Sequence, residues 1–377
     1  MTRGHLLYIF DHLDWKSRMP VALAAKKAGY NVTIGIVGAD EDDQIDGLDG
    51  FQVLGLRKPA NQFGLLSAFV SLWDIRKTIQ QCRPDLIHTV TLKYSFLVGL
   101  ACTGLRRYRV LYTIAGLGFL FRTSGARSTL IRWALSPFLK LVLKNRHADL
   151  IFQNPDDRDL LVNMGYVRHK QTHLVISSGV DLDKFSPAPE PENAEPIAMM
   201  PTRLVHEKGV AVFVAAARKL HAKGIKARYQ IVGGLTTHNP RAITEAEMKA
   251  YTEDGVVEWV GPVQDMPAIL STAAVIVYPS YYGEGVPRVT IEACAAGRPV
   301  ITTDHPGCRE VVPNGDNGYL VPVKDVSATA EAMERLLTDR DLRKQMGKAS
   351  RTLAEMAFDI KSIVAQTVGL YAHILHK

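Results

Sequence analysis

Hydrophobic residues are arranged along the chain in short continuous runs that alternate with longer amphipathic segments. A run that is apolar at successive positions is typical of a strand buried on both faces. Helical periodicity separates most of these runs, beginning with residues 17–30, and this alternation predicts a doubly wound parallel sheet. In the first half of the chain the expected strands are 5–10, 31–37, 85–90, 109–114, 148–154 and 172–177.

The same alternation restarts after Ser186–Pro196, a proline-rich and acidic segment that predicts a linker. The second half has expected strands at 197–204, 227–234, 256–261, 273–280 and 299–304. We therefore expect two Rossmann-like domains, residues 1–185 and 197–377, with a last helix that could return to the first domain. Their strand ends would face a cleft, which is the default ligand site.

Composition describes a globular protein, since the 377 residues are 47% hydrophobic and 22% charged. The four cysteines have neither metal-site nor disulfide spacing, which favours a reducing compartment. Residues 1–10 are too short an apolar segment for a signal peptide. A cytoplasmic location is the expectation.

Positive charge is concentrated in the first half, where residues 1–180 hold 23 Lys and Arg against 14 Asp and Glu. No acidic residue occurs between Asp85 and Asp149, and ten Lys and Arg occur there. This imbalance predicts an anionic partner, either nucleic acid or a membrane surface. No recognised nucleic-acid motif is present, which disfavours the first.

Residues 119–147 combine these bases with large apolar side chains, as in a basic amphipathic helix at an anionic membrane. The apolar residues of interest are Phe119, Phe121, Trp133, Leu135, Phe138 and Leu141. The alternative is a core helix with solvated arginines. Two neighbouring apolar runs of 12 residues are too short to span a bilayer, so any membrane association would be peripheral.

Two glutamates eight positions apart, Glu284 and Glu292, follow the expected strand 273–280. Pro287 fixes φ and lacks an N–H, so it predicts a helix start between them. Glu284 then lies in a loop beyond a strand end, and Glu292 lies in the second turn of the helix. The alternative is a pair of solvated surface glutamates.

The loop around Glu284 is suited to a phosphate-bearing ligand that also has hydroxyl groups. Gly285 allows close backbone approach, and Val286, which precedes Pro287, is pushed toward an extended conformation. The new helix directs free N–H groups at the ligand, and Arg288 could reinforce a phosphate contact. The carboxylate would accept hydrogen bonds from hydroxyls.

A second cluster of candidate residues follows the first strand of the second domain, where Arg203 and Lys208 precede a helix. Two cations at a strand end can clamp a diphosphate, although ordinary loop charges are the alternative. Gly233 stands at the end of the next expected strand and marks another close backbone approach. No Asp-x-Asp sequence lies beside these candidate residues, so we expect no metal and expect these two cations to substitute for one.

In this order and spacing, the second half resembles the retaining GT-B glycosyltransferases of family 4. The match covers "PTRLVHEKG", "IVGG", the Glu-x7-Glu motif and "GRPVITTDHPGCREVVPNGDNGYLVPVKD". The resemblance implies that Glu292 binds the ribose hydroxyls of a nucleotide sugar and that Glu284 holds a hydroxyl of the donor sugar. It implies further that Arg203 and Lys208 neutralise the departing diphosphate.

The first half resembles bacterial enzymes that extend undecaprenyl-diphosphate-linked sugars, among them N-acetylgalactosaminyltransferases. The segments concerned are "IHTVTLKYS", "TIAGLGFLF", "IFQNPDDRDLLVNMGY" and "ISSGVDLDKF". This resemblance implies a UDP-sugar donor, a polyprenyl-diphosphate-linked acceptor and work at the inner face of the cytoplasmic membrane. The chain departs from the family twice: "DHLDWKSR" replaces a glycine-rich loop, and Ala115 stands where many members have a catalytic histidine.

Three residues of the first half are candidates for acceptor contacts, namely His88 at a strand end, Lys93 and Arg18. Their alternatives are a core histidine and two ordinary surface charges. A glycosyltransferase with a soluble acceptor is the main rival function. A dehydrogenase is disfavoured because no G-x-G-x-x-G follows an expected strand. The sequence does not identify the sugar, the linkage or the oligomeric state.

Overall fold

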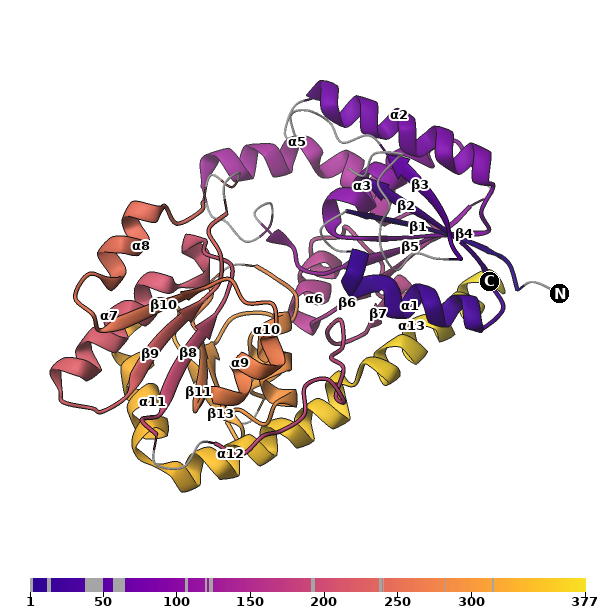
Figure 1. Cartoon of the computed structure of the whole chain (residues 1–377). Coiled ribbons are helices and arrows are strands. Elements are labelled where there is room, and N and C mark those ends of the chain that lie inside the picture. The colour runs from indigo at the N-terminus through magenta and orange to yellow at the C-terminus, as the bar shows by residue number, and fades with distance from the viewer. Residues whose placement is uncertain are drawn as a thin grey trace. The chain divides into compact units, whose positions relative to one another are not determined.

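The computed structural model describes residues 3–11, 15–37, 50–56, 65–105, 108–118, 121, 125–190, 194–236, 239, 241–281, 283–313 and 315–377. The chain forms two compact units (Figure 1). Unit 1 comprises Met1–Ser178 together with Lys361–Lys377, and unit 2 comprises Gly179–Ile360. The boundary therefore lies at Ser178, and the segment expected as a linker belongs to unit 2.

Unit 1 contains a seven-stranded sheet in the order β3-β2-β1-β4-β5-β6-β7, with every pair parallel. The doubly wound α/β fold predicted from the sequence is confirmed. Strand β3 was not predicted, because this edge strand is short and partly exposed. The strands are β1 (His5–Asp11), β2 (Asn31–Val37), β3 (Gln52–Leu56), β4 (Leu86–Val90), β5 (Arg109–Ile114), β6 (Ala148–Phe152) and β7 (Thr172–Leu174).

Helices cover both faces of this sheet, because successive side chains of each strand point to opposite faces. On β1, Leu7 and Ile9 join the core beneath α2, α3 and α5, whereas Leu6 and Tyr8 join the core beneath α1 and α13 (Figure 1). The helices are α1 (Trp15–Lys27), α2 (Leu65–Cys82), α3 (Leu92–Ala101), α5 (Ala126–Leu143), α6 (Pro155–Asn163) and α13 (Ile360–Leu375).

Unit 2 contains a six-stranded parallel sheet in the order β10-β9-β8-β11-β12-β13. The direction of winding reverses between β8 and β11, which are neighbours although about 75 residues separate them. Its strands are β8 (Ile197–Pro201), β9 (Arg228–Val232), β10 (Val257–Gly261), β11 (Val275–Tyr278), β12 (Val300–Thr303) and β13 (Gly318–Val321).

The helices of unit 2 lie on both faces of its sheet, and α7 and α11 pack together over one hydrophobic core. They are α7 (Val210–Ala222), α8 (Glu245–Thr252), α9 (Met266–Thr272), α10 (Arg288–Ala295), α11 (Val326–Thr338) and α12 (Arg340–Leu353), with 3-10 turns at η2 (His206–Lys208) and η3 (Arg309–Val311). Helix α10 begins directly after Pro287, as the proline predicted. Within the described residues, no helix combines the length and the apolarity needed to cross a bilayer.

Candidate active site

The candidate residues of unit 2 gather at the carboxyl ends of β8 and β11. Lys208 ends the 3-10 turn η2 that follows β8, and Glu284 lies in the loop that follows β11. These two strands flank the point where the strand order reverses. In open α/β sheets, ligands bind in the crevice at such a switch point.

Lys208 is the centre of a compact polar cluster. Its side chain is buried, and its Nζ donates to Glu284 Oε2 at 2.5 Å and to the Tyr278 hydroxyl at 2.6 Å. Tyr278 donates in turn to Glu284 Oε1 at 3.0 Å. An ammonium group has three donors, so one N–H of Lys208 remains beyond these two bonds.

The Glu284 carboxylate is held from several sides. Besides Lys208 and Tyr278, it accepts a hydrogen bond from Ser280 Oγ at 2.9 Å, so both of its oxygens are engaged. Burial raises the pKa of Tyr278 well above its ordinary value, and the charge of Glu284 raises it further. Tyr278 therefore stays protonated and remains a donor to this carboxylate.

Sequence reasoning missed Tyr278 and Ser280, although both stand at the end of the expected strand 273–280. It also missed Gly307, which has a φ of +82°. A Cβ at this position would lie 1.9 Å from the backbone oxygen of Gly285 and 2.7 Å from that of Glu284. Only glycine therefore lets the loop after β12 pack against the Glu284 loop.

Gly233 has a comparable role in packing two loops. Its φ is +155°, and a Cβ would lie 1.9 Å from the backbone oxygen of Thr202. Gly233 thus lets the end of β9 approach the loop after β8, the loop that leads to Arg203 and Lys208. Gly285 and Val286 are buried, so the Glu284 loop is packed into unit 2.

Arg203 is exposed, unlike Lys208. Within the described part of the chain its guanidinium makes no hydrogen bond or ion pair. Its positive charge counteracts the rise in the pKa of Tyr278, which places it near the polar cluster. A partnerless arginine beside a buried Lys–Glu pair can bind an anion.

Glu292 and Arg288 form a second pair on the first two turns of α10. Arg288 Nε donates to Glu292 Oε1 at 2.8 Å, and the two residues are one helical turn apart. Burial raises the pKa of Glu292, and the charge of Arg288 opposes the rise. Arg288 was expected at a phosphate, but here its Nε binds the glutamate.

In unit 1, the ring of His88 is buried and has partners on both sides. Its Nδ1 lies 2.8 Å from the Tyr371 hydroxyl and its Nε2 lies 2.8 Å from Thr113 Oγ1. Burial lowers the pKa of His88 to about 3, and the charge of Arg18 lowers it as well. The imidazole is therefore neutral near pH 7, and neither nitrogen is open to a ligand unless a protein partner leaves.

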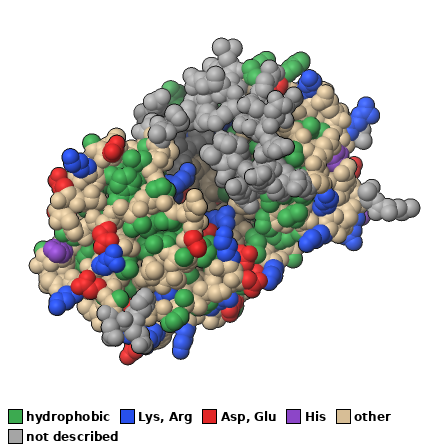
Figure 2. All heavy atoms as spheres, viewed as in Figure 1, with side chains coloured by type: hydrophobic (Ala, Val, Ile, Leu, Met, Phe, Trp, Pro, Cys, Tyr) green, Lys and Arg blue, Asp and Glu red, His purple; other side chains and the backbone are tan. Residues whose placement is uncertain are grey.

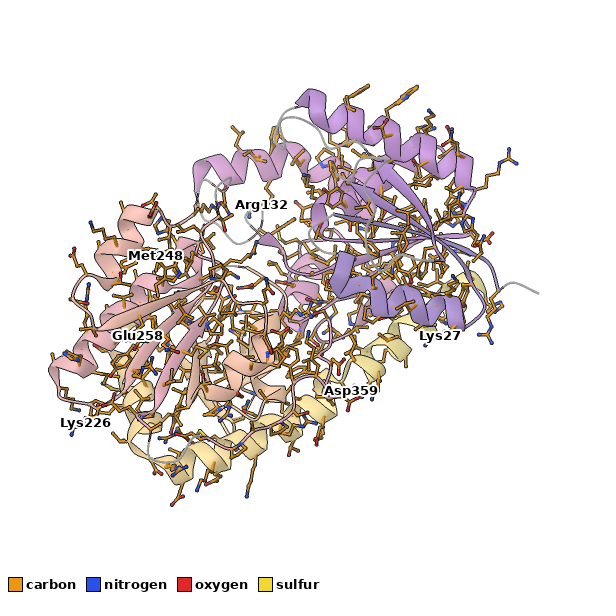
Figure 3. All side chains as sticks on the ribbon, viewed as in Figure 1. Lys27, Arg132, Lys226, Met248, Glu258 and Asp359 are labelled. Atoms are coloured by element: carbon orange, nitrogen blue, oxygen red, sulfur yellow. The ribbon has the colours of Figure 1, made fainter. Side chains whose placement is uncertain are left out.

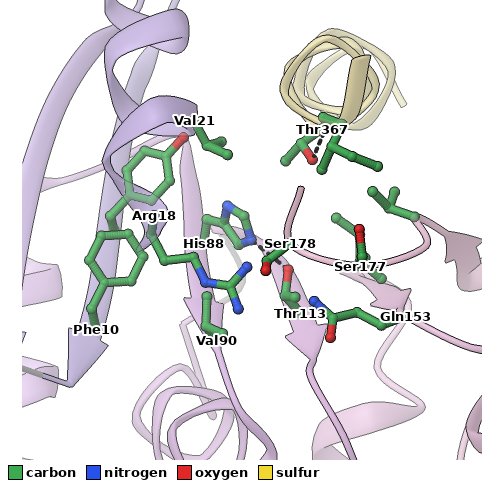
Figure 4. Close-up of a pocket in the computed structure, with 14 residues that line it drawn as sticks. Phe10, Arg18, Val21, His88, Val90, Thr113, Gln153, Ser177, Ser178 and Thr367 are labelled. Atoms are coloured by element: carbon green, nitrogen blue, oxygen red, sulfur yellow. Dashed lines mark hydrogen bonds between the residues drawn. The ribbon is translucent and has the colours of Figure 1, made fainter. Parts of the chain in front are cut away.

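His88 and Arg18 line one pocket at the carboxyl ends of β1, β4, β5 and β6. Figure 4 shows Arg18 directed into this pocket, with its guanidinium among His88, Val90 and Thr113. Lys93 does not line it. Lys93 is exposed on α3, with its Nζ 5.3 Å from the centre of the Tyr94 ring. The structure thus brings together two of the three acceptor candidates.

Other sequence expectations fall partly outside the described residues. Of the segment "DHLDWKSR", residues 12–14 lie outside them, as do Phe119 and the side chain of Arg127. Phe121 is buried in the core of unit 1, so it is not a surface residue as the amphipathic interpretation required, and Leu135 is partly buried against that core. Among the described residues, no three His, Cys, Asp or Glu side chains are grouped to hold a metal ion.

Family models match both units of the chain. The model described as glycosyl transferases group 1 matches residues 182–353, and the model described as glycosyl transferase 4-like matches residues 5–154.

Two curated relatives cover most of the chain. The N,N'-diacetylbacillosaminyl-diphospho-undecaprenol alpha-1,3-N-acetylgalactosaminyltransferase of Campylobacter jejuni is 27% identical over 95% of each chain. The UDP-Gal:alpha-D-GlcNAc-diphosphoundecaprenol alpha-1,3-galactosyltransferase of Escherichia coli is 24% identical over 81% of this chain and 80% of its own.

Solved structures with low sequence identity share the fold. Sucrose-phosphate synthase from Thermosynechococcus elongatus superposes with a TM-score of 0.81 at 22% identity, covering 99% of this chain and 100% of its own. HepE from Anabaena, solved with UDP and glucose, gives 0.75 at 17% identity, with 97% and 99% covered. With both family models and the GT-B fold in agreement, the chain belongs to the glycosyltransferases, group 1 in its second unit and glycosyl transferase 4-like in its first.

Proposed function

We propose that this enzyme transfers a sugar from a UDP-sugar to a polyprenyl-diphosphate-linked saccharide, with retention of the anomeric configuration. The observation that carries the proposal is the Lys208–Glu284–Tyr278 cluster at the strand-order switch point of unit 2, with Arg203 exposed beside it. The names of the Campylobacter jejuni and Escherichia coli relatives support a lipid-diphosphate acceptor. HepE, solved with UDP, supports the nucleotide.

In the proposed reaction, the bond between the anomeric carbon and the β-phosphate oxygen breaks as a bond to an acceptor hydroxyl oxygen forms. The electron pair of the broken bond leaves with UDP, and the proton of the acceptor hydroxyl passes to solvent water. Negative charge therefore develops on the departing diphosphate. Arg203, the remaining N–H of Lys208 and the free amides at the start of α10 would stabilise it electrostatically.

Glu284 and Glu292 would position the donor rather than attack it. Glu284, fixed by Lys208, Tyr278 and Ser280, would accept a hydrogen bond from a sugar hydroxyl. Glu292 would accept from the ribose hydroxyls, in which case Arg288 would hold the carboxylate in place from the exposed side. No covalent nucleophile is proposed.

One side of unit 1 would contact the membrane surface and would bind the lipid-linked acceptor there. On α5 the large apolar side chains Leu130, Trp133, Phe138 and Leu141 are exposed, with Trp133 at 74%. Arg132 and Lys140 lie on the same helix, and Lys144 follows its last residue (Figure 3 labels Arg132). Cations near an anionic leaflet contribute roughly 1 kcal/mol each, and the apolar residues add burial.

Helix α2 of the same unit carries further exposed apolar residues, which were not singled out in the sequence. Phe69, Val70 and Trp73 are exposed there by 69%, 41% and 65%. Because α2 and α5 both cover the same face of the unit 1 sheet, their exposed residues can enter one interface together. Exposed apolar residues on neighbouring helices, combined with bases, are typical of peripheral membrane association.

Donor screening by nucleotide release tests the proposal directly. Purified enzyme is given a panel of UDP-, GDP- and ADP-sugars with and without an undecaprenyl-diphosphate-linked saccharide. We expect release of UDP that depends on the lipid-linked acceptor. Release that is equally fast with soluble sugars as acceptors would support the rival function instead.

Vesicle sedimentation tests the membrane part of the proposal separately. We expect the protein to sediment with vesicles that contain anionic lipid and much less with neutral vesicles. A variant with Trp73→Ser and Trp133→Ser should sediment less and lose activity on the lipid acceptor, while its affinity for UDP is unchanged. If this variant sediments and turns over like the wild type, these helices are ordinary domain surface.

A further inference from the structure

A second pocket of unit 2 lies at the amino-terminal ends of its strands, whereas the candidate active site lies at their carboxyl ends. Two buried residues that line it, Ala274 and Pro299, immediately precede β11 and β12, whereas Lys208 and Glu284 lie beyond strand ends. The other walls are residues 187–190 and one face of α12. The volume is about 690 Å³, which lies in the range of small-molecule sites, about 300–1,000 Å³.

The lining of this pocket, here called the α12 pocket, is strongly basic. Among the described residues that line it, Glu190 is the only carboxylate, and both of its oxygens are bound by Arg343, at 2.6 and 3.0 Å. Acidic and basic side chains are interspersed over the face of unit 2 that Figure 2 shows, so this concentration of one sign is local. The cations that line the pocket are Arg298, Arg340, Arg343, Lys344, Lys348 and Arg351.

Arg298 lies buried in the wall of the α12 pocket, with 4% of its surface exposed. Its Nη2 donates to two neutral carbonyl oxygens, those of Ala188 at 2.7 Å and Ser271 at 2.6 Å. Its Nε has no hydrogen-bond partner among the described residues, and burial lowers the pKa of its guanidinium although Glu190 opposes this. A buried cation with no carboxylate in ion-pair contact is unfavourable, and a bound anion would offset that.

Three further cations form a row along the wall that α12 provides. Arg340, Lys344 and Lys348 are four residues apart, so they lie on one face at intervals of about 6 Å along the axis. The Nε of Arg340 is buried and has no hydrogen-bond partner in the described part of the chain, while its Nη2 donates to the backbone oxygen of Glu190 at 3.4 Å. Lys344 lies 4.0 Å from Asp341, and Lys348 has no partner among the described residues. A ligand that satisfies this row needs several negative charges.

We propose that the α12 pocket binds a soluble ligand that carries two or more phosphate groups. Guanidinium groups match phosphate geometry with paired donors, and lysines add point charges. The spaced row favours a ligand with several phosphates over a monocarboxylate, and the volume of the pocket favours a small molecule. This inference is independent of the proposed glycosyl transfer, because it uses none of the residues at the carboxyl edge.

Calorimetric titration with sodium tripolyphosphate tests the inference. The test variant Arg340→Gln/Lys348→Gln removes two lining charges and leaves Arg298 and Arg343, which brace the pocket wall. The control variant Lys226→Gln/Lys249→Gln removes two exposed lysines of unit 2 that do not line the pocket (Figure 3 labels Lys226). A Lys208→Ala variant reports any tripolyphosphate bound at the other edge of the sheet.

We expect tripolyphosphate affinity to fall at least tenfold in the test variant and to stay within twofold of wild type in the control variant. Thermal unfolding of all variants verifies that they are folded. The proposal is overturned if no binding is measured, if both double variants lose affinity equally, or if only Lys208→Ala loses it. Sedimentation with phosphatidic acid vesicles that the test variant loses and the control variant keeps, in the absence of tripolyphosphate binding, would also overturn it, by assigning the pocket to lipid headgroups.

Discussion

The two sheets of this glycosyltransferase end in polar clusters of different electrical character. At the carboxyl edge of unit 1, His88 is linked to Tyr371 and Thr113, and Tyr371 is linked to Tyr8, at distances of 2.6–2.8 Å. Because burial lowers the pKa of His88 to about 3, this network is neutral. At the carboxyl edge of unit 2, the corresponding cluster is built around the ion pair of Lys208 and Glu284.

On our proposal, this difference distinguishes a structural network in unit 1 from a catalytic cluster in unit 2. Tyr371 belongs to α13, so the neutral network fastens the returning helix to the sheet of unit 1. The charged cluster does not attach a terminal helix to its sheet. Its members all lie on the loops and strands that surround the switch point. A strand-end position is therefore insufficient to identify a catalytic group, and the unbalanced charge of Arg203 beside the cluster is the more informative feature.

The largest effect should follow removal of the charge at the centre of the unit 2 cluster. Lys208→Ala is expected to lower kcat by at least about a hundredfold, the scale for loss of one group that stabilises transition-state charge. The loss is measured by UDP release, with circular dichroism to verify folding. Activity within twofold of wild type would remove Lys208 from the mechanism.

A matched pair of tyrosine variants sharpens the comparison between the clusters. Tyr278→Phe removes the hydroxyl that joins Lys208 to Glu284, and we expect kcat/KM to fall about tenfold, since hydrogen bonds to charged groups contribute about 1.5–3 kcal/mol. Tyr371→Phe removes the equivalent hydroxyl of the neutral network and should leave kcat/KM nearly unchanged. Equal losses of kcat/KM in the two variants would contradict the distinction.

Glu292→Gln tests the second pair of unit 2. If Glu292 holds ribose hydroxyls, the variant should bind UDP about fivefold more weakly, because the amide keeps one acceptor oxygen but loses the charge. Calorimetry with UDP alone measures this. Unchanged UDP affinity would leave the Arg288–Glu292 pair with a purely structural role.

The smallest predicted effect is on the pH dependence of stability. The folded pKa of His88, about 3, lies below the ordinary value of 6.5, so the unfolded chain binds more protons between these values. His88 therefore destabilises the fold progressively as pH falls from about 6.5 toward 3. The unfolding midpoint of a His88→Gln variant should fall less steeply over pH 6.5–4.5 than that of wild type; parallel curves would show that His88 titrates normally.

Much of the fold could be predicted because buried parallel strands are apolar at every position. The strands from β8 to β12 each coincide with an expected run. The edge strand β3 lacks this pattern, since two of its five residues are exposed. The sequence left open whether the last helix, α13, belongs to the second domain or returns to the first. Periodicity identifies a helix but not the sheet that it covers.

The sequence predicted which strand ends carry the candidate site residues, but it did not predict which of their side chains contact one another. Glu284 was expected to bind a sugar hydroxyl and Lys208 to bind the diphosphate. Their ion pair was not predicted, because it joins residues 76 positions apart and no local sequence pattern encodes such a contact. Gly307 acts through the backbone of another loop, so its role was equally hidden. The bond of Arg288 to Glu292 was within reach of sequence reasoning, because residues four apart on a helix are neighbours.

Binding of UDP to three proteins tests the central claim most directly, namely that the charged cluster of unit 2, and not the pocket of unit 1, holds the donor diphosphate. UDP is titrated calorimetrically into wild type, Lys208→Ala and Arg18→Gln, the last of which removes the cation of the unit 1 pocket. The account predicts that UDP binds to wild type, binds at least tenfold more weakly to Lys208→Ala, and binds to Arg18→Gln as to wild type. Unchanged affinity in Lys208→Ala, or loss of binding in Arg18→Gln alone, would contradict it.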